Sequence, residues 1–437
     1  MARIDQVIPK TTRRETAVQF GGGGFLRGFF DWMLQEANDA GVYDGSVVVV
    51  QSTSGGVADA LMRQNGQYTQ ILRGAEGVKA CPIDVVSRCV KVYEDFPAFL
   101  ALAKVPTLRL IVSNTTEAGI RFEPEEEIAS PISFPARLTA LLRRRHQLGL
   151  PGFVVLPCEL IEENGRTLRE YVLRHARLWG LGEDFARFVE RDNHFLNTLV
   201  DRINTGYPSG ETMDLGYEDE LVNCCEWYHL WVIEGDKALA AEIPFDRAGL
   251  NVKWVDDLAP YRTRKVRILN GAHTATVALA MLAGVETVGE AVADHEIGAF
   301  MRRAVFEEII PTLDLPSEEL EEYAEGVFRR FQNPFIRHEW RAISLNSVSK
   351  FRMRVLPSIL EYERRFGRIP PNLIRSLAIL IELYREFEVR DEPRVIAAMR
   401  RSCVREILSD EALWGADIRH LSAAVEGNLT KTSEGRA

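Results

Sequence analysis

The first half of the chain alternates continuous apolar runs with amphipathic stretches. The apolar runs cover residues 17–20, 46–50, 108–113 and 152–156, and residues 135–148 between the last two have helical spacing. Continuous apolar runs are typical of parallel strands that are covered on both faces. Strands that alternate with helices in this way predict an α/β fold with a doubly wound parallel sheet.

The pattern changes after Asp257. Apolar runs of the strand type stop there, and helical periodicity continues to about residue 426. A change of period of this kind marks a change of structural class along the chain. We therefore expect an α/β domain at residues 1–257 and an all-helical domain at residues 258–437.

Five shorter segments have weaker patterns. We expect residues 1–15 to be a loose polar lead-in and residues 166–200 to be helical. Residues 226–234 and 250–256 are expected to add further strands. The small, polar tail from Asn428 is expected to be disordered.

A glycine-rich turn follows the first predicted strand and leads into a helical pattern. Strand, glycine turn and helix in this order are the context of a dinucleotide-binding fingerprint. Gly21 would allow the tight turn, Gly23 would let a pyrophosphate approach the backbone, and the helix N-terminus would supply amide donors. Leu26 stands where the usual pattern has its third glycine, so an ordinary glycine-rich loop is the alternative. The candidate cofactor-binding residues here are Phe20, Gly21, Gly22, Gly23, Gly24, Phe25, Leu26 and Arg27.

Polar residues also follow two other predicted strands at their carboxyl ends, where ligands bind in open α/β sheets. Gln51 follows residues 46–50, in the place where NAD enzymes usually carry an acid for the ribose hydroxyls. No arginine stands there to favour the 2′-phosphate of NADP. The strand at residues 108–113 leads into a second candidate cofactor-binding set, Ser113, Asn114, Thr115 and Glu117.

The segment Lys265-Val-Arg-Ile-Leu-Asn270-Gly-Ala-His273 places an amine, a carboxamide and an imidazole within nine residues. On an α-helix, Asn270 would lie about 140° and His273 about 80° around from Lys265. Hydride transfer without a metal needs a base for the hydroxyl proton and neutral donors for the oxygen. The alternative, which spacing alone favours, is a lysine at a helix start, a capping asparagine and a satisfied core histidine.

Composition narrows the class of protein. The 437 residues carry a formal net charge of -10 with both signs mixed, which argues against a nucleic-acid partner. No run of about 20 apolar residues predicts a membrane span, and the N-terminus lacks a secretory pattern, so we expect a cytoplasmic protein. The six cysteines lack CxxC spacing and the eight histidines are scattered, so we expect reduced thiols and no metal site.

Ten segments together resemble one family. They are VQFGGGGFLRGFFDW, VVVVQ, QYTQILRG, VSNTTEAGI, PCELIEENG, LVDRINTGYP, KVRILNGAHT, EEIIPTLDLP, NPFIRH and KFRMRVLP. From Val18 to about Ile381 the chain is similar to the polyol-specific long-chain dehydrogenases, the mannitol dehydrogenase family. The phrases NTTEAG and LVDRI-x-TGYP point to members that act on sugar acids. The resemblance implies a Rossmann-type doubly wound sheet followed by an all-helical C-terminal domain. It also implies NAD as cofactor, with NADP not excluded.

The resemblance also implies residue roles. A lysine acts as general acid/base without a metal, which matches Lys265, and two asparagines that fix the reacting oxygen match Asn197 and Asn270. A substrate-contacting histidine matches His273, and a lysine on the helical domain matches Lys350. The family carries an acid three positions before the lysine, where this chain has Arg262. The candidate substrate-binding residues are therefore Lys350, Arg341 and Arg262.

Two physical demands follow from this reading. An amine with a pKa of about 10.4 is a poor base near neutrality, so the pKa of Lys265 would have to fall toward about 7–8. Nearby positive charge can do this, and the candidates are Arg262, Arg264 and Arg267. A sugar acid needs a site for its carboxylate, for which a cluster of Arg337, Arg341, Lys350, Arg352 and Arg354 is available. The alternative for that cluster is a solvated basic face.

The sequence therefore predicts an NAD-dependent oxidoreductase that interconverts a keto-sugar acid and its polyol acid. Within the family, an epimeric sugar acid or a neutral, mannitol-type polyol is the alternative substrate. A nucleotide-sensing protein that lost the chemistry would show an eroded catalytic set, and a metal-dependent isomerase or hydrolase would need clustered ligands. The expected partner is a small sugar acid, with no nucleic acid and no membrane, and the chain is expected to be a monomer or small homo-oligomer.

Overall fold

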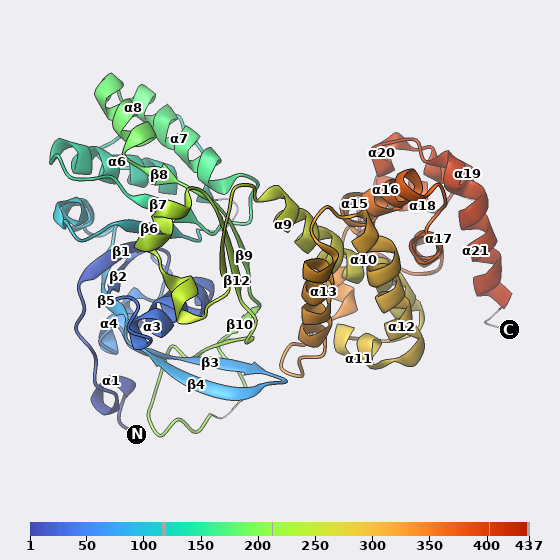
Figure 1. Cartoon of the computed structure of the whole chain (residues 1–437), viewed down its shortest axis with the longest axis horizontal. Helices are drawn as coiled ribbons and strands as arrows, with labels where there is room; N and C mark the ends of the chain where they lie inside the picture. The colour runs from blue at the N-terminus through green and yellow to red at the C-terminus, as the bar shows by residue number, and fades with distance from the viewer. Residues whose placement is uncertain (116–118, 212, 402, 435–437) are drawn as a thin grey trace. The chain divides into compact units, whose positions relative to one another are not determined.

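The computed structural model divides into two compact units, Met1–Leu258 and Ala259–Ala437. The structure describes residues 1–115, 119–211, 213–401 and 403–434, with side chains up to residue 429. The boundary expected from the sequence lies one residue before the one between these units. Each unit is described by itself below (Figure 1).

Unit 1 is built on a sheet of six strands in the order β5-β2-β1-β6-β7-β8, all parallel. Numbered within this sheet alone, the order is 3-2-1-4-5-6, that of a Rossmann fold, so the predicted doubly wound sheet is confirmed. Successive strands are added on one side of β1 up to β5 and on its other side from β6 onward. This change of side puts the turn after β1 beside the loop after β6. The strands are β1 (Glu15–Phe20), β2 (Ser46–Gln51), β5 (Val86–Lys91), β6 (Leu110–Ser113), β7 (Val154–Pro157) and β8 (His194–Phe195).

Helices cover both faces of this sheet, and successive strand residues point to opposite faces. In β2, Val47 and Val49 belong to one core cluster whereas Val48 and Val50 belong to the other. One face is covered by α2 (Gly24–Leu26), η1 (Arg27–Asp31), α3 (Trp32–Asp39) and α4 (Ala58–Arg63). The other is covered by α5 (Phe96–Ala101), α6 (Phe134–Gln147), α7 (Asn164–Leu178) and α8 (Gly182–Arg191). Two covered faces explain why the strands are apolar throughout.

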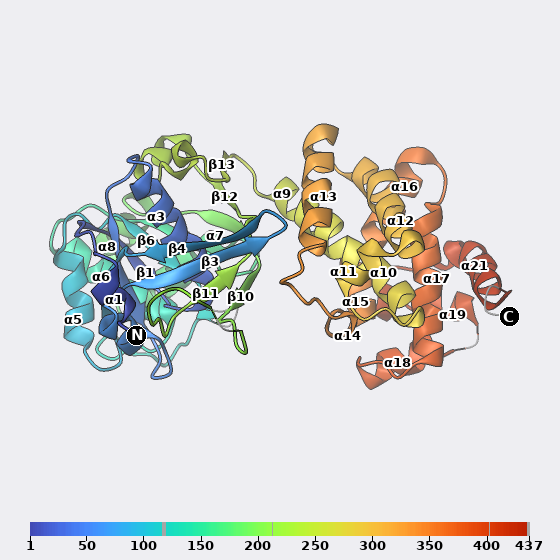
Figure 2. The same cartoon turned by 90° about the horizontal axis from the view of Figure 1, so that it is seen from below.

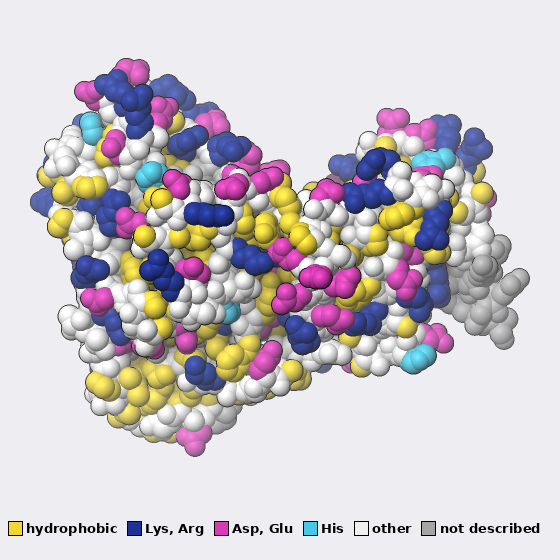
Figure 3. Space-filling view, in the orientation of Figure 1, with side chains coloured by type: hydrophobic (Ala, Val, Ile, Leu, Met, Phe, Trp, Pro, Cys, Tyr) yellow, Lys and Arg dark blue, Asp and Glu magenta, His cyan; other side chains and the backbone are white. Residues whose placement is uncertain are grey.

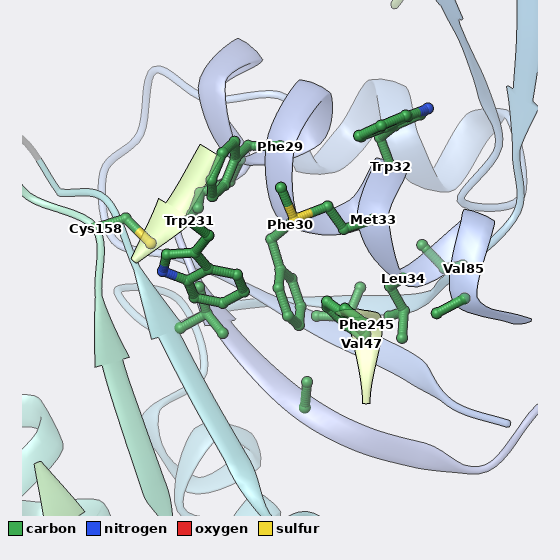
Figure 4. Close-up of a cluster of buried hydrophobic side chains, with 14 of the residues drawn as sticks. Phe29, Phe30, Trp32, Met33, Leu34, Val47, Val85, Cys158, Trp231 and Phe245 are labelled. Atoms are coloured by element: carbon green, nitrogen blue, oxygen red, sulfur yellow. The ribbon is translucent and has the colours of Figure 1, made fainter. Parts of the chain in front are cut away.

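The first of these clusters is centred on aromatic side chains. Phe29 and Phe30 leave the helix after the glycine turn and point toward Trp231 (Figure 4), with ring centroids 5.6 and 6.2 Å from it. Trp231 lies on β12 (Leu230–Glu234), outside the six-stranded sheet, and is fully buried. This packing fixes the helix that carries the glycine turn against a second sheet.

Two smaller sheets complete unit 1. One has the order β10-β11-β3-β4 and the other β13-β12-β9. Their strands are β3 (Tyr68–Gly74), β4 (Gly77–Ile83), β9 (Asn197–Asp201), β10 (Asn204–Gly206), β11 (Asn223–Cys225), β12 (Leu230–Glu234) and β13 (Val252–Val255). The strands expected at 226–234 and 250–256 are thus confirmed.

The helical expectation for residues 166–200 is wrong at its end. Helix α8 ends at Arg191, and residues 194–195 and 197–201 are the strands β8 and β9. Every residue of β9 is buried. A short apolar run of this kind cannot be told from a buried helix by its period, and pairing with β12 decides between them.

The expectation for residues 1–15 is wrong, and so is the one for the tail over residues 428–434, while residues 435–437 lie outside the described residues. Residues Ile4–Val7 form the short helix α1, and the amino group of Met1 lies 2.9 Å from a carboxylate oxygen of Glu218. At the other end, the tail from Asn428 continues helix α21 (Ser422–Glu434). Both ends are therefore held by local structure as far as the described residues extend.

All the regular elements described in unit 2 are helices, as predicted (Figure 2). Helix α10 is buried almost all round, which is typical of a helix at the centre of a domain. Its neighbour is α17, where the Ser376 hydroxyl donates to the Ala275 carbonyl over 2.6 Å. The helices are α9 (Ala259–Arg264), η6 (Lys265–Asn270), α10 (Gly271–Leu282), α11 (Val288–Ala293), α12 (His295–Arg303), η7 (Ala304–Ile309), η8 (Ile310–Thr312), α13 (Ser317–Phe331), α14 (Trp340–Ile343), α15 (Ser347–Arg354), α16 (Leu356–Phe366), α17 (Pro371–Glu386), α18 (Pro393–Met399), α19 (Val404–Leu408), α20 (Glu411–Trp414), η9 (Arg419–Leu421) and α21.

No helix within the described ranges is long and apolar enough to cross a lipid bilayer.

A buried acid lies on the helix that follows the glycine turn. Asp31 is fully buried at the end of η1 and accepts a hydrogen bond from the Tyr68 hydroxyl over 3.1 Å. Burial raises the pKa of Asp31 to about 7, although Tyr68, Arg27 and Gln19 act in the opposite direction. The sequence analysis did not single out this residue, because a single Asp at a helical position carries no visible sign of burial.

Asp31→Asn is expected to change how stability depends on pH. The folded protein keeps a proton on Asp31 up to about pH 7, whereas the unfolded chain loses it near pH 4. Between these values the folded state binds more protons, so the free energy of unfolding falls as pH rises, by up to about 1.4 kcal/mol per pH unit. The variant should lack this fall. Thermal melts from pH 4 to 8 measure it, with Asp39→Asn at an exposed site on the same helix as control. If the stability of wild type and of Asp31→Asn changed with pH in the same way, the raised pKa of Asp31 would be contradicted.

Candidate active site

The glycine turn has the geometry that the fingerprint requires at two positions. Gly21 has φ +107°, its N–H donates to the Val50 carbonyl over 3.1 Å, and an added Cβ would lie 3.3 Å from the Asn114 carbonyl oxygen. A Cβ on Gly23 would meet nothing within 4 Å. Gly23 also directly precedes α2, whose backbone amides point outward at this end. Gly21 therefore makes the turn, and Gly23 leaves the backbone open where a dinucleotide's pyrophosphate would need to approach.

The missing third glycine has a structural explanation. Leu26 is buried and packs toward Gly21, so this position faces the core. The close helix approach is made instead at Gly24 and Gly28, where an added Cβ would lie 2.9 and 2.8 Å from the side-chain amide of Asn223. The Asn223 amide also donates to the Gly24 carbonyl over 2.9 Å. The helix is thus fitted against the four-stranded sheet that contains β11 through a pair of glycines four residues apart.

The other side chains of the turn hold its backbone in place through hydrogen bonds and packing. The Arg27 guanidinium donates to the carbonyls of Gly22, over 3.1 Å, and Leu221, over 2.6 Å, and is almost fully buried. Phe20 lies in the core, and Phe25 stacks on Phe29 with ring centroids 5.1 Å apart. Cofactor contacts from Phe20, Leu26 and Arg27 remain a prediction, and the buried side chains limit such contacts to the backbone.

Glu159 organises the neighbouring loop after β6. Its carboxylate accepts from the Ser113 hydroxyl over 3.0 Å, and from the Thr115 amide and hydroxyl over 2.8 and 2.9 Å. The Asn114 side chain donates to the Cys158 carbonyl over 2.9 Å. Glu159 is almost fully buried, and burial raises its pKa, which these hydrogen bonds oppose. The sequence analysis missed this residue, and its signal is an acid two positions after the end of a buried strand. The candidate Glu117 lies outside the described residues.

Gln51 is engaged within the protein. Its Nε2 donates to the Thr53 carbonyl over 2.9 Å and to the Tyr93 hydroxyl over 3.1 Å, and its Oε1 accepts from the Ala58 amide over 2.8 Å. Both hydrogens of the amide are therefore used. What remains for a ribose hydroxyl is one lone pair on Oε1.

Asn197, at the start of β9, is held in one orientation. Its Oδ1 accepts from the Arg166 amide over 3.1 Å, and its Nδ2 donates to Glu234 Oε1 over 3.0 Å. The other oxygen of Glu234 accepts from the Leu258 amide over 2.9 Å. An amide nitrogen has two hydrogens, so one N–H of Asn197 is left for a ligand. The sequence analysis missed Glu234, an acid at the end of a buried strand, because only the pairing of β9 with β12 brings it opposite Asn197.

Gly165 makes this arrangement possible. It is the second residue of α7, and an added Cβ would lie 2.3 Å from the Leu196 carbonyl oxygen and 2.8 Å from the Asn197 nitrogen. Only glycine lets the start of the helix come this close to the strand. The approach in turn brings the Arg166 amide within reach of the Asn197 side chain.

In unit 2, the segment Lys265–Asn270 is the π-helix η6 rather than a regular α-helix. Hydrogen bonds from residue i to i+5 place residues five apart about one turn from each other, on the same side. Lys265 and Asn270 are five residues apart, so the π-helix aligns them more closely than the α-helix assumed from the sequence. π-helical turns occur frequently at functional sites.

His273 follows in the first turn of α10 and is not a satisfied core histidine. Its ring is almost fully buried, 4.4 Å from the Phe331 ring and 5.8 Å from the His338 ring. Within the described structure its Nε2 has no hydrogen-bond partner. Burial lowers the pKa of His273 to about 3, and positive charge on neighbouring side chains adds to this. The imidazole is thus neutral near pH 7, and its Nε2 is both buried and unpartnered in the described structure.

The predicted cations of unit 2 differ in their surroundings. Arg264 is buried and paired with Glu319 over 2.8 Å, so its charge is compensated. Lys350 is half-buried and donates to the Ile343 carbonyl over 2.8 Å, and burial lowers its pKa. Arg341 is exposed on α14, and Arg262 is half-buried on α9. Of the three arginines expected to act on Lys265, Arg264 is therefore the weakest candidate.

The candidate residues fall into two groups. Unit 1 holds the glycine turn, Gln51, the loop after β6 and Asn197. Unit 2 holds Lys265, Asn270, His273 and the candidate substrate cations. Among the described residues, no group of three or more His, Cys, Asp or Glu side chains could hold a metal ion.

Two family models match successive parts of the chain. The mannitol dehydrogenase Rossmann domain matches residues 15–247, and the mannitol dehydrogenase C-terminal domain matches residues 257–432. The chain belongs to the mannitol dehydrogenase family. It is therefore an oxidoreductase, and the resemblance of its ten sequence segments to this family is confirmed.

Curated relatives within the mannitol dehydrogenase family are similar over nearly the whole chain. Altronate oxidoreductase of Klebsiella pneumoniae (strain 342) is 42% identical, with 96% of this chain and 94% of that protein covered. Altronate oxidoreductase of Bacillus subtilis (strain 168) is 41% identical, with 93% and 90% covered.

Solved structures support the mannitol dehydrogenase fold. D-Sorbitol dehydrogenase in substrate-free form has a TM-score of 0.81 at 20% identity, with 99% of both chains covered. The ternary complex of Pseudomonas fluorescens mannitol 2-dehydrogenase with NAD and D-mannitol has a TM-score of 0.70 at 22% identity, with 98% of this chain and 94% of that chain covered.

Gly165→Ala is expected to reduce turnover by displacing Asn197. The added methyl group would meet the backbone of residues 196–197, so α7 and β9 must move apart by a substantial part of an ångström. Misplacing a catalytic group by about 1 Å can lower the rate about 100-fold. We expect kcat to fall by about that factor while NADH still binds, as measured by steady-state kinetics and NADH titration. Gly326→Ala, on helix α13, should retain wild-type kcat, because its added Cβ would make only an ordinary contact, 3.8 Å from Arg329 Nη2. An unchanged kcat in Gly165→Ala would contradict the role of Asn197.

Proposed function

We propose that this member of the mannitol dehydrogenase family is an NAD-dependent tagaturonate reductase, or altronate oxidoreductase. It would interconvert the keto-sugar acid tagaturonate and its polyol acid altronate by hydride transfer. The curated relatives carry this name, and they match nearly the whole chain at 41–42% identity. A neutral, buried and unpartnered His273 directly after the Lys265–Asn270 π-helix is the observation that carries the proposal of an active site.

The residues fit a dinucleotide. The positive φ of Gly21, the open backbone at Gly23 and the helix start at Gly24 would hold a pyrophosphate, and residues 113–115 would border it. NAD supplies hydride chemistry when bound. The mannitol 2-dehydrogenase structure contains NAD. Gln51 is neither an acid nor a cation, so we propose a preference for NAD over NADP that is modest.

The side chains can be assigned roles in ketone reduction. Lys265 would donate a proton to the substrate oxygen in reduction and take it back in oxidation, as a general acid/base. The side-chain amides of Asn270 and Asn197 would act as donors to a substrate oxygen that gains negative charge, and one such donor is worth about 3–4 kcal/mol at the transition state. His273, fixed as a neutral ring, would bind a substrate hydroxyl through Nε2. No metal is assigned a role, since the protein side chains supply both the proton and the donors.

The substrate panel that tests this proposal measures kcat/KM for two hexuronates and two neutral ketoses with NADH and with NADPH. We expect tagaturonate with NADH to give the highest value, at least tenfold above fructuronate, tagatose and fructose, and NADPH to be less efficient. Loss of a charged hydrogen bond to the carboxylate justifies this factor for the two neutral ketoses. Fructuronate keeps the carboxylate and differs only in stereochemistry, so the preference over it rests on the name that the curated relatives carry. A higher value with fructuronate would indicate fructuronate reductase, and a higher value with a neutral ketose would indicate a mannitol-type dehydrogenase. A higher value with NADPH would direct attention to Ser52 and Ser54 as phosphate donors.

A further inference from the structure

Three half-buried cations of unit 2 lack a carboxylate partner among the described residues. Arg267 donates to the Met353 carbonyl over 2.9 Å, and Lys350 to the Ile343 carbonyl over 2.8 Å. Arg354 makes one long contact, 3.4 Å from its Nη1 to the Thr274 hydroxyl. Burial lowers the pKa of all three groups. Arg267 and Arg354 are therefore partly removed from water without a protein anion nearby in the described part of the chain, whereas Lys350 has a longer-range interaction with Asp391.

Other basic residues of this unit have a different environment. Arg264 pairs with Glu319 over 2.8 Å, Arg337 with Glu286 over 3.0 Å and Arg365 with Asp314 over 2.6 Å. Basic and acidic side chains are likewise interspersed on the face in view in Figure 3. Partly burying a cation without an anion is unfavourable, so a cluster of such cations indicates a site that a ligand's anion completes.

The cluster faces the candidate active site. Lys350 and Arg354 are four residues apart on α15 and so lie on one side of that helix. Arg354 reaches Thr274, the residue after His273. Helix α15 packs against α10, which carries His273, and the His338 ring lies 5.8 Å from that of His273. The charges of Arg354, Arg330 and Lys350 add to the lowering of the pKa of His273. The unpartnered Nε2 of His273 is thus the second buried group here that lacks a ligand.

We propose that Arg354 binds the carboxylate of the substrate, with Lys350 beside it, and that Arg354 makes the enzyme specific for a sugar acid over a neutral ketose. This inference rests on the proposed function. A guanidinium presents a planar fork of donors that matches a carboxylate. Arg354 uses one donor in a long contact, whereas Arg267 is closely bound to a carbonyl.

The structure separates Arg354 from the other members of the basic cluster seen in the sequence. Arg337 is exposed and paired with Glu286 and Glu339. Arg341 and Arg352 are exposed, and the Arg352 side chain lies against Gly415, 3.5 Å from the position of an added Cβ. A solvated basic face describes these three residues, and only Lys350 and Arg354 are half-buried beside His273.

The test compares Arg354→Gln with Arg352→Gln, the same change on the exposed side of the same helix. With NADH, Arg354→Gln should lower kcat/KM for tagaturonate by roughly 10- to 100-fold, mainly through KM, because a charged hydrogen bond is lost. Activity with tagatose, the ketose without the carboxylate, should stay within about twofold of wild type, and so should NADH affinity. Tm should not fall. Arg354→Lys should recover part of the loss, and Arg352→Gln should behave as wild type.

Two results overturn the inference in distinguishable ways. If wild type reduces tagaturonate well and Arg354→Gln keeps the wild-type ratio of tagaturonate to tagatose, or loses both activities equally, Arg354 does not recognise the carboxylate. If wild type reduces neutral ketoses but no hexuronate, the proposed function fails, and the carboxylate site fails with it.

Discussion

The pairing of β1 with β6 is the constraint on which the cofactor half of this protein depends. The strand order changes side at this pair, and the two strands are parallel. The turn after β1 and the loop after β6 therefore lie side by side at the carboxyl ends of the strands. The contact is close enough that a Cβ at Gly21 would lie 3.3 Å from the Asn114 carbonyl oxygen. Arg27 holds the turn and Glu159 holds the loop, each through backbone hydrogen bonds. The surfaces presented to a ligand are therefore backbone surfaces, supported by buried charged side chains.

Buried polar groups divide into those that the protein satisfies and those that it leaves open. Glu159 and Glu234 are fully used to orient Ser113, Thr115 and Asn197. His273 Nε2 lacks a partner in the described structure, and Arg354 has only a long contact. Unsatisfied buried groups destabilise a fold, so groups that persist in this state indicate where a ligand binds. Other buried polar atoms, including both ring nitrogens of His175 and Nε1 of Trp231, also lack a partner in the described structure, so it is the place of His273 beside Arg354 and the Lys265–Asn270 π-helix that marks it as functional.

The features that could be predicted from the sequence are those that a local pattern of residues determines. Four apolar runs were recognised as strands, the glycine turn was placed between strand and helix, and the change to helices after Asp257 was located. The hairpin β3–β4 and strand β9 were missed, because pairing between distant segments decides their structure. The π-helix at Lys265–Asn270 was missed for a related reason, since no residue type marks it. The choice of Arg354 among five neighbouring basic residues required burial and partners, which sequence spacing does not contain.

The central claim is that Lys265 is the general acid/base of a hydride-transfer enzyme. The most direct measurement compares Lys265→Ala with Lys237→Ala, a change at an exposed lysine in unit 1, for NADH-dependent ketone reduction and for NADH affinity. Removal of a general acid should lower kcat by about 100- to 10,000-fold while the affinity for NADH stays within about twofold, and Lys237→Ala should match wild type. Turnover of Lys265→Ala within tenfold of wild type would contradict the claim.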